Sequence, residues 1–302
     1  MTMNVPTPES IVPARRSSAF GSLARFFDRH PRVRLWSFLT GPMAWLVVAY
    51  LGSLALMLAT SLHPVDDFTS QPIRSRWTDA NLRSLVDFSG PYPAKILRTI
   101  GVAASVTAID IILAVPIAFV LVKVLSPRWR RVAVVAVLMP LWASYLVKVY
   151  AWRTLLNPEG GVLVKSIGVT PGYSLTALVI VLAYLWLPYM ILPVMSGLER
   201  LPDSLLEASA DLGGRTGRTV RSVVLPLLVP AVAAGSIFTF SLSLGDYISV
   251  KLVGGTTDVL GSVVERQLST NLPLAAAIAV GSVIVMGAYL TGVRRLGAFE
   301  SL

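Results

Sequence analysis

Six apolar stretches, each about as long as a membrane-spanning helix, constrain the fold of this 302-residue chain more than any other feature. A helix needs about 20 mostly apolar residues to cross a bilayer. The candidate spans lie at about residues 42–62, 97–122, 132–155, 174–198, 224–245 and 272–293. Charged residues make up only 14% of the chain, against roughly a quarter in soluble domains. The sequence therefore predicts an all-α, polytopic membrane protein with six transmembrane helices.

Basic residues indicate the orientation of these helices. Sixteen of the 26 lysines and arginines lie in four segments that six spans place on one face: the N-terminal tail, the turn between the second and third spans, residues 199–226, and the C-terminal tail. Cytoplasmic loops carry the excess of such residues. We therefore expect both termini in the cytoplasm, with residues 1–41 as a partly disordered tail and residues 42–302 as the membrane domain. The tail is no cleavable signal peptide, because the first apolar run starts too late.

Several function classes are excluded by what the sequence lacks. It has no cysteine and only two histidines, His30 and His63, which rules out thiolate and multi-histidine metal sites. The glycine-rich "DLGGRTGR" has no Lys-Ser/Thr ending, so the chain is not expected to bind ATP or another cofactor. The net charge of +10 is explained by the basic cytoplasmic loops, and nucleic-acid binding is not expected. We expect no enzyme activity in this chain.

One polar insert, "EASADLGGRTGRTVRSVVLP" (residues 207–226), separates the fourth and fifth spans. Asp203 or Ser204 can cap a short helix, with Glu207 completing a capping box with Ser204. Gly213 and Gly214 end that helix, and a second helix begins near Thr216. The sequence thus predicts two short helices around a rigid glycine corner, although a simple connecting loop is the alternative.

The insert resembles the EAA loop of ABC-importer permeases, in which E-A-A, three residues, Gly, nine residues, Ile, one residue and Leu-Pro follow one another. Ser209 replaces the second alanine and Val223 replaces the isoleucine, and every spacing is kept. The matching residues are Glu207, Ala208, Ser209, Gly213, Val223, Leu225 and Pro226.

This resemblance implies a type I importer permease with the MetI-like fold, in which residues 199–226 couple it to a cytoplasmic ATPase. Implied partners are an ABC ATPase dimer that binds the ATP, a second homologous permease subunit in a heterodimer, a periplasmic or lipid-anchored solute-binding protein, and the lipid bilayer. A self-sufficient secondary transporter is the competing class; it would leave the insert unexplained.

Three further segments resemble the spermidine/putrescine branch: "PLWASYLVKVYAWRTLL", "LPYMILPVMSGLERLP" and "SLGDYISVKLVGG". The resemblance covers roughly residue 95 to the C-terminus and implies a polyamine as solute. Related branches carry opines, phosphonates, iron or thiamine, and these alternatives stay open.

A polyamine needs carboxylates and aromatic faces along its route. Asp110 lies within the second span, where an ionisable residue is costly and indicates function, although a polar contact within the bundle or an ion pair with a basic group explains it equally well. Asp246 and Tyr247 follow the fifth span and are candidates for the pathway mouth, with an interfacial cap as the alternative. Trp186 is a weaker candidate, because tryptophans in such chains more often pack or lie at the interface.

Overall fold

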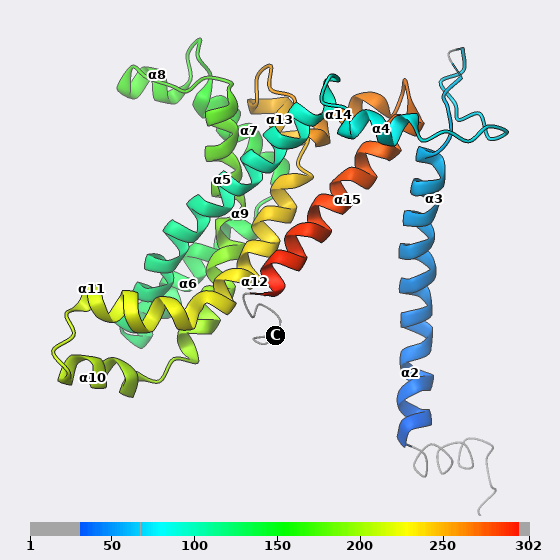
Figure 1. Ribbon diagram of the computed structural model, residues 1–302. Helices are drawn as coiled ribbons and strands as arrows, with labels where there is room; N and C mark the ends of the chain where they lie inside the picture. Colours follow the sequence, from blue (N-terminus) through cyan, green and yellow to red (C-terminus); the bar gives the residue numbers. More distant parts are fainter. Residues whose placement is uncertain (1–30, 67, 296–302) are drawn as a thin grey trace, which may run out of the picture. The chain divides into compact units, whose positions relative to one another are not determined.

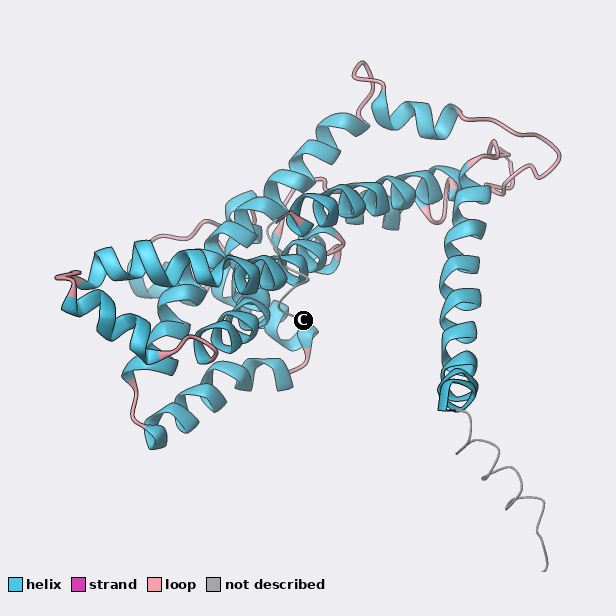
Figure 2. Ribbon diagram, turned by 60° about the horizontal axis from the view of Figure 1, so that its bottom comes forward, coloured by secondary structure: helices cyan, strands magenta, loops and turns pink. Residues whose placement is uncertain are grey.

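The structure, a computed structural model, describes residues 31–66 and 68–295 and is built from helices (Figures 1 and 2). Within these ranges the only β-pairing is an isolated bridge between Val65 and Pro72. The chain divides into two compact units, residues 1–56 and 57–302. The described residues do not include 1–30, which are most of the predicted cytoplasmic tail, or 296–302.

The described part of the first unit, residues 31–56, is helical throughout. Helix α2 (Pro31–Leu46), the π-helical turn η1 (Val47–Leu51) and α3 (Gly52–Ser61) follow one another without a break, and α3 continues into the second unit. The segment Phe38–Ser61 is long and apolar enough to cross a membrane. The helix therefore starts well before residue 42, where we placed the first span.

Three helices form the centre of the second unit: α5 (Tyr92–Phe119), α9 (Leu175–Glu199) and α12 (Leu225–Leu244). Small residues let α9 and α12 approach closely, as is common between helices in membranes. A methyl group added at Gly197 would lie 2.6 Å from the Ala231 side chain, and one at Gly235 would lie 2.6 Å from the Met190 sulfur. The two glycines thus set the separation of α9 and α12.

The third predicted span is broken into two helices. Helix α6 (Pro127–Trp142) and helix α7 (Tyr145–Leu156) meet at an angle of 93°. Pro140 lies in the last turn of α6, and Ala143 has extended backbone after it, so the α-helical hydrogen bonding stops there. We predicted the third span over 132–155, and the structure places a sharp bend within it; five helices among the described residues are long and apolar enough to span, or six if this bent pair counts as one.

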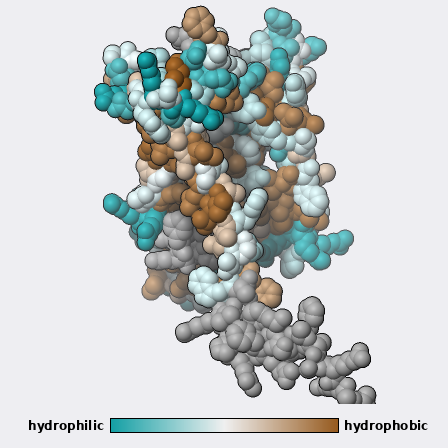
Figure 3. All heavy atoms as spheres, turned by 90° about the vertical axis from the view of Figure 1, so that its right-hand side faces the viewer, coloured by the Kyte–Doolittle hydropathy of each residue, from teal (hydrophilic) through white to brown (hydrophobic). Residues whose placement is uncertain are grey.

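Short helices gather at the end of the second unit opposite the insert (Figure 1). They are α4 (Ala80–Val86), α8 (Val162–Ile167), α13 (Ile248–Val253) and α14 (Leu260–Gln267). The last long helix, α15 (Leu272–Arg294), packs against α14, α4 and α12. In Figure 3, most of the hydrophobic residues on the visible face lie between its top and its lower edge, where the hydrophilic residues gather, as expected for helices that cross a membrane.

Candidate functional site

The insert folds into a helical hairpin that leads directly into α12. Helix α10 (Asp203–Asp211) is followed by a four-residue turn, then α11 (Thr216–Thr219) and the π-helical turn η3 (Val220–Val224), which joins α12 without a break. Gly213 has φ of +75°, the left-handed conformation that glycine adopts at no steric cost. The predicted glycine corner is therefore present, and its second arm is continuous with the fifth span.

Ser209 closes this hairpin. Its hydroxyl lies 2.8 Å from the Thr219 hydroxyl in a hydrogen bond between the two arms, and its carbonyl accepts a 2.8 Å bond from the N–H of Gly214. A methyl group at Gly214 would come within 2.6 Å of the Ser209 carbonyl oxygen, so this position is also restricted to glycine. The serine at the second alanine position of the motif thus has a bonding role of its own.

The expected capping box is absent from α10. The residue at the N-cap is Pro202, and no side chain caps the helix. Asp203 instead accepts a 2.6 Å hydrogen bond from the Lys123 ammonium, so its carboxylate is directed at another element. Glu207, which we expected to complete the box, has an exposed side chain.

Two basic residues connect the start of the hairpin and the end of α9 to neighbouring helices. Lys123 lies in the π-helical turn η2 (Val120–Val124), which continues α5. Its side chain is only 12% exposed, and its ammonium donates to the Leu201 carbonyl oxygen at 2.9 Å as well as to Asp203. Arg130 of α6 pairs with Glu199 at the end of α9. A displacement of the hairpin would therefore be transmitted to α5 and α6 as well as to α12.

The remaining motif residues are distributed over the surface of the hairpin and its exit. Val223 is half-buried, and Ala208, Leu225 and Pro226 are exposed. At the corner, the Leu212 side chain is 90% exposed. Apolar and small groups are thus presented around Gly213, where a partner protein could bury them.

Asp246 lies in a buried polar cluster just beyond the end of α12. Its carboxylate accepts hydrogen bonds from the Tyr145 hydroxyl (2.6 Å), the Ser249 backbone N–H (2.8 Å) and the Ser249 hydroxyl (3.1 Å). Trp186 stacks on Tyr145 with ring centroids 5.9 Å apart. Asp246, Tyr145 and Trp186 line one cavity of about 360 Å³, to which Tyr247 also contributes. The structure thus brings three of the predicted pathway residues together.

Asp110 is separate from this cluster. It is fully buried in α5, and neither of its carboxylate oxygens has a hydrogen-bond partner. It is not among the residues that line the Asp246 cavity. Among the described residues, its carboxylate therefore makes neither a polar contact within the bundle nor an ion pair with a basic group, and its role in the pathway stays a prediction.

Sequence reasoning missed Tyr145 and Ser249. Ser249 could have been found, because Asp246 and Ser249 have the spacing at which a carboxylate caps a following helix, here α13. Tyr145 gives no such signal, since it lies 101 residues from Asp246 and its position depends on the bend between α6 and α7. Among the described residues, no group of three or more His, Asp or Glu side chains could hold a metal ion.

Comparison with known proteins identifies the family. Residues 74–296 match the family described as the inner membrane component of binding-protein-dependent transport systems. The chain belongs to this family of ABC-importer permeases. It is therefore a multi-pass protein of the bacterial inner membrane and a non-catalytic transport subunit that binds no cofactor. Transporters of this family work with ATPase subunits, which handle ATP, and with a periplasmic binding protein.

Two relatives show how similar the chain is to named permeases. It is 41% identical over 307 residues to the inner membrane ABC transporter permease protein YdcU of Escherichia coli, covering 93% of this chain and 96% of the relative. It is 30% identical over 257 residues to the spermidine/putrescine transport system permease protein PotB of Haemophilus influenzae, covering 80% of this chain and 87% of PotB.

Solved structures support the fold. One match is a chain of a bacterial alginate ABC transporter, crystallised with its periplasmic protein bound to an alginate pentasaccharide. The TM-score is 0.66 at 16% identity, and the match covers 92% of this permease and 98% of that chain. The inward-facing MetNI methionine transporter matches with a TM-score of 0.55 at 16% identity, over 69% of this permease and 95% of the other chain. The fold is the type I importer permease fold.

Proposed function

We propose that this permease imports a linear polyamine of the spermidine or putrescine class, and that the carboxylate of Asp246 binds an ammonium group of the solute at the mouth of the pathway. The observation that carries the proposal is the Asp246 cavity, in which a buried carboxylate lies beside the rings of Tyr145 and Trp186. Carboxylates pair with ammonium groups, and aromatic faces attract them.

The named relatives are consistent with this solute. PotB, at 30% identity, carries a spermidine/putrescine designation, whereas the name of YdcU, at 41% identity, specifies no solute. Family membership by itself leaves the solute open, because permeases of one fold serve many solutes. The proposal therefore rests on the chemistry around Asp246.

Residues 199–226 are proposed to dock onto one subunit of a cytoplasmic ATPase dimer, with the Gly213 corner and the exposed Leu212 side chain at the contact. The bonds from Lys123 and the continuity of η3 with α12 provide routes for its movement into the membrane. A second, homologous permease subunit is proposed to complete the pathway, with both termini on the cytoplasmic side.

The test is uptake by the whole transporter, reconstituted in liposomes with ATPase, second permease and binding protein. Radiolabelled putrescine or spermidine should accumulate with ATP inside the vesicles. We expect Asp246→Asn to lower that uptake at least about tenfold, since hydrogen bonds between charged groups contribute roughly 1.5–3 kcal/mol, while its remaining oxygen can still accept from Ser249.

Asp258→Asn is the matched control, because Asp258 is an outer-surface carboxylate paired with Lys95 and Arg266. It should leave uptake within about twofold of the parent. If the parent transporter accumulates neither amine, or if Asp246→Asn transports them normally, the proposed function is wrong.

A further inference from the structure

Four aromatic rings form a continuous series between the Asp246 cavity and the cytoplasmic half of the protein. Tyr145 stacks on Trp186 at 5.9 Å between centroids, Trp186 meets Tyr189 edge-on at 5.9 Å, and Tyr189 stacks on Phe238 at 6.5 Å. The rings come from three helices, α7, α9 and α12. We call these four residues the ring series.

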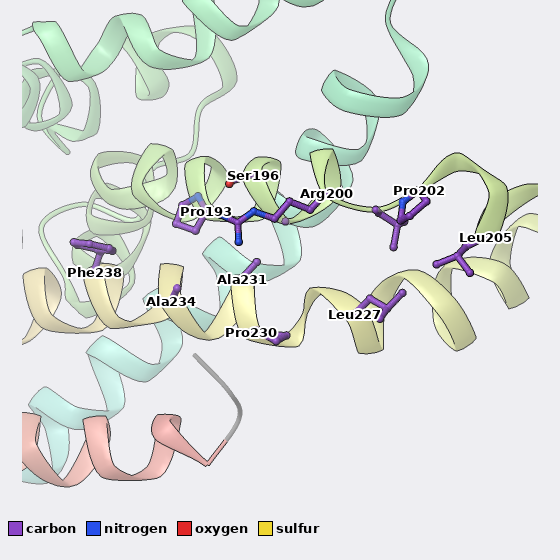
Figure 4. A pocket seen from close by; sticks show the side chains of 12 residues that line it. Pro193, Ser196, Arg200, Pro202, Leu205, Leu227, Pro230, Ala231, Ala234 and Phe238 are labelled. Atoms are coloured by element: carbon purple, nitrogen blue, oxygen red, sulfur yellow. The ribbon is translucent and has the colours of Figure 1, made fainter. Parts of the chain in front are cut away.

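Both ends of the ring series open into a hollow. Tyr145 and Trp186 line the 360 Å³ cavity that contains Asp246. Phe238 lines a groove of about 440 Å³ between α9 and α12, shown in Figure 4. In that view Phe238 lies at one end of the groove and Leu205 toward the other, with the Arg200 side chain between them. Tyr189 contacts the ring on either side and so connects the cavity with the groove.

We propose that Tyr189 and Phe238 form a second ammonium subsite, which binds the far end of a linear triamine whose near end is at Asp246. The inference rests on the proposed function and adds a reason why the transporter would distinguish amines by their length. Phe238 is half exposed, with 50% of its surface accessible, so a ring is available to a ligand. Ring faces attract ammonium groups, and methylene spacers pack against them.

The spacing of the two subsites sets the length of the ligand. Phe238 lies eight residues before Asp246 along α12 and its exit, which corresponds to about 12 Å at the helical rise. A triamine with seven methylenes and a central nitrogen between its terminal nitrogens is nearly this long when extended. A four-carbon diamine has about half the length and reaches only one of the subsites.

Charge places the second subsite at the Phe238 end of the groove. Arg200 lines the same groove, and its guanidinium would repel an ammonium group nearby. In Figure 4 the Arg200 side chain lies between Phe238 and Leu205, so its charge discourages an ammonium group from moving past Phe238 toward Leu205.

The test compares spermidine and putrescine uptake by the reconstituted transporter. Each amine is supplied with an excess of binding protein that is saturated with it, so that the preference of the binding protein does not affect the comparison. We expect Tyr189→Leu and Phe238→Leu each to lower the maximal spermidine uptake rate about 5–10-fold, the range that loss of a cation–π contact in a desolvated site allows. Putrescine uptake should stay within about twofold. Tyr189→Phe, which keeps the ring, should transport both amines like the parent.

Tyr184→Leu is the matched control. Tyr184 lies on the same helix and contacts Trp152 at 5.4 Å, outside the ring series. Equal losses for both amines in Tyr189→Leu, or the same loss in Tyr184→Leu, would show that the rings only pack and would overturn the inference. Normal spermidine uptake by both leucine variants would overturn the inference and leave the proposed function intact, whereas a parent that carries neither amine would overturn both.

Discussion

Replacing Gly213 tests whether the left-handed corner of the hairpin is needed for coupling. A methyl group added at Gly213 would meet no atom within 4 Å, so a side chain there has room. The cost of Gly213→Ala therefore comes from the backbone alone. For an L-residue the left-handed conformation costs about 1–2 kcal/mol. Asparagine adopts this conformation more readily and should cost less.

The expected effect follows from that energy. A penalty of about 1–2 kcal/mol shifts the equilibrium between the observed corner and other geometries by roughly 5- to 30-fold. If the corner must keep its shape to transmit movement from the ATPase, solute moved per ATP hydrolysed should fall by up to that factor in Gly213→Ala. Gly213→Asp, which also adds a charge at the contact, should uncouple more completely. ATP hydrolysis should continue in both variants.

The assay is simultaneous measurement of uptake and ATP hydrolysis in proteoliposomes. Gly217→Ala is the control, because Gly217 is in α11, has no atom within 4 Å of an added methyl group and has no left-handed backbone. Gly217→Ala should move as much solute per ATP as the parent, and Gly213→Asn should retain most of that coupling. The reasoning is refuted if Gly213→Ala and Gly213→Asp transport as much solute per ATP as the parent.

Two further predictions concern charged contacts at the two ends of the protein. Lys123→Met should cost about 1–3 kcal/mol in detergent unfolding, since it leaves the Leu201 carbonyl without its charged donor. Asp203→Asn should cost less than about 1 kcal/mol, because that carboxylate is 75% exposed; equal losses would contradict this. At the other end, hydrogen bonding from Arg266 and then Lys95 lowers the pKa of Asp258 from 3.8 to about 2. The stabilisation is thus complete above pH 3.8 and lost as the pH falls toward about 2. Thermal unfolding should show Asp258→Asn less stable than the parent at pH 7, with the difference closing between pH 4 and 2; a difference unchanged at pH 2 would contradict it.

The helical character of the chain and the corner of the insert could be predicted from the sequence. Long apolar runs leave few choices in lipid, because only helices or closed barrels satisfy their backbone groups there. The position of Gly213 likewise follows from local chemistry, since a short polar helix followed by Gly-Gly ends in a left-handed turn. Both are decided by neighbouring residues.

The sequence did not reveal the bend in the third span, and it predicted a capping box that α10 lacks. The two helices of this segment pass the length and composition test for a span only when taken together, and that test does not show the break after Trp142. At α10 the local pattern favoured a capping box between Ser204 and Glu207, but the helix begins at Asp203 with Pro202 as its N-cap, so Ser204 lies inside it. The Asp203 carboxylate accepts a hydrogen bond from Lys123, 80 residues away, a contact that no local pattern encodes.

The sequence by itself determined an all-helical membrane protein with a glycine-cornered insert, because apolar length and glycine spacing act over a few residues. Only the tertiary structure decided that Asp246 is joined by Tyr145, that Asp110 stays apart from them, and that four rings connect a cavity with a groove. These arrangements depend on how α7, α9 and α12 pack and where the third span bends. Contacts between residues distant in sequence are fixed by that packing, and no local pattern encodes them.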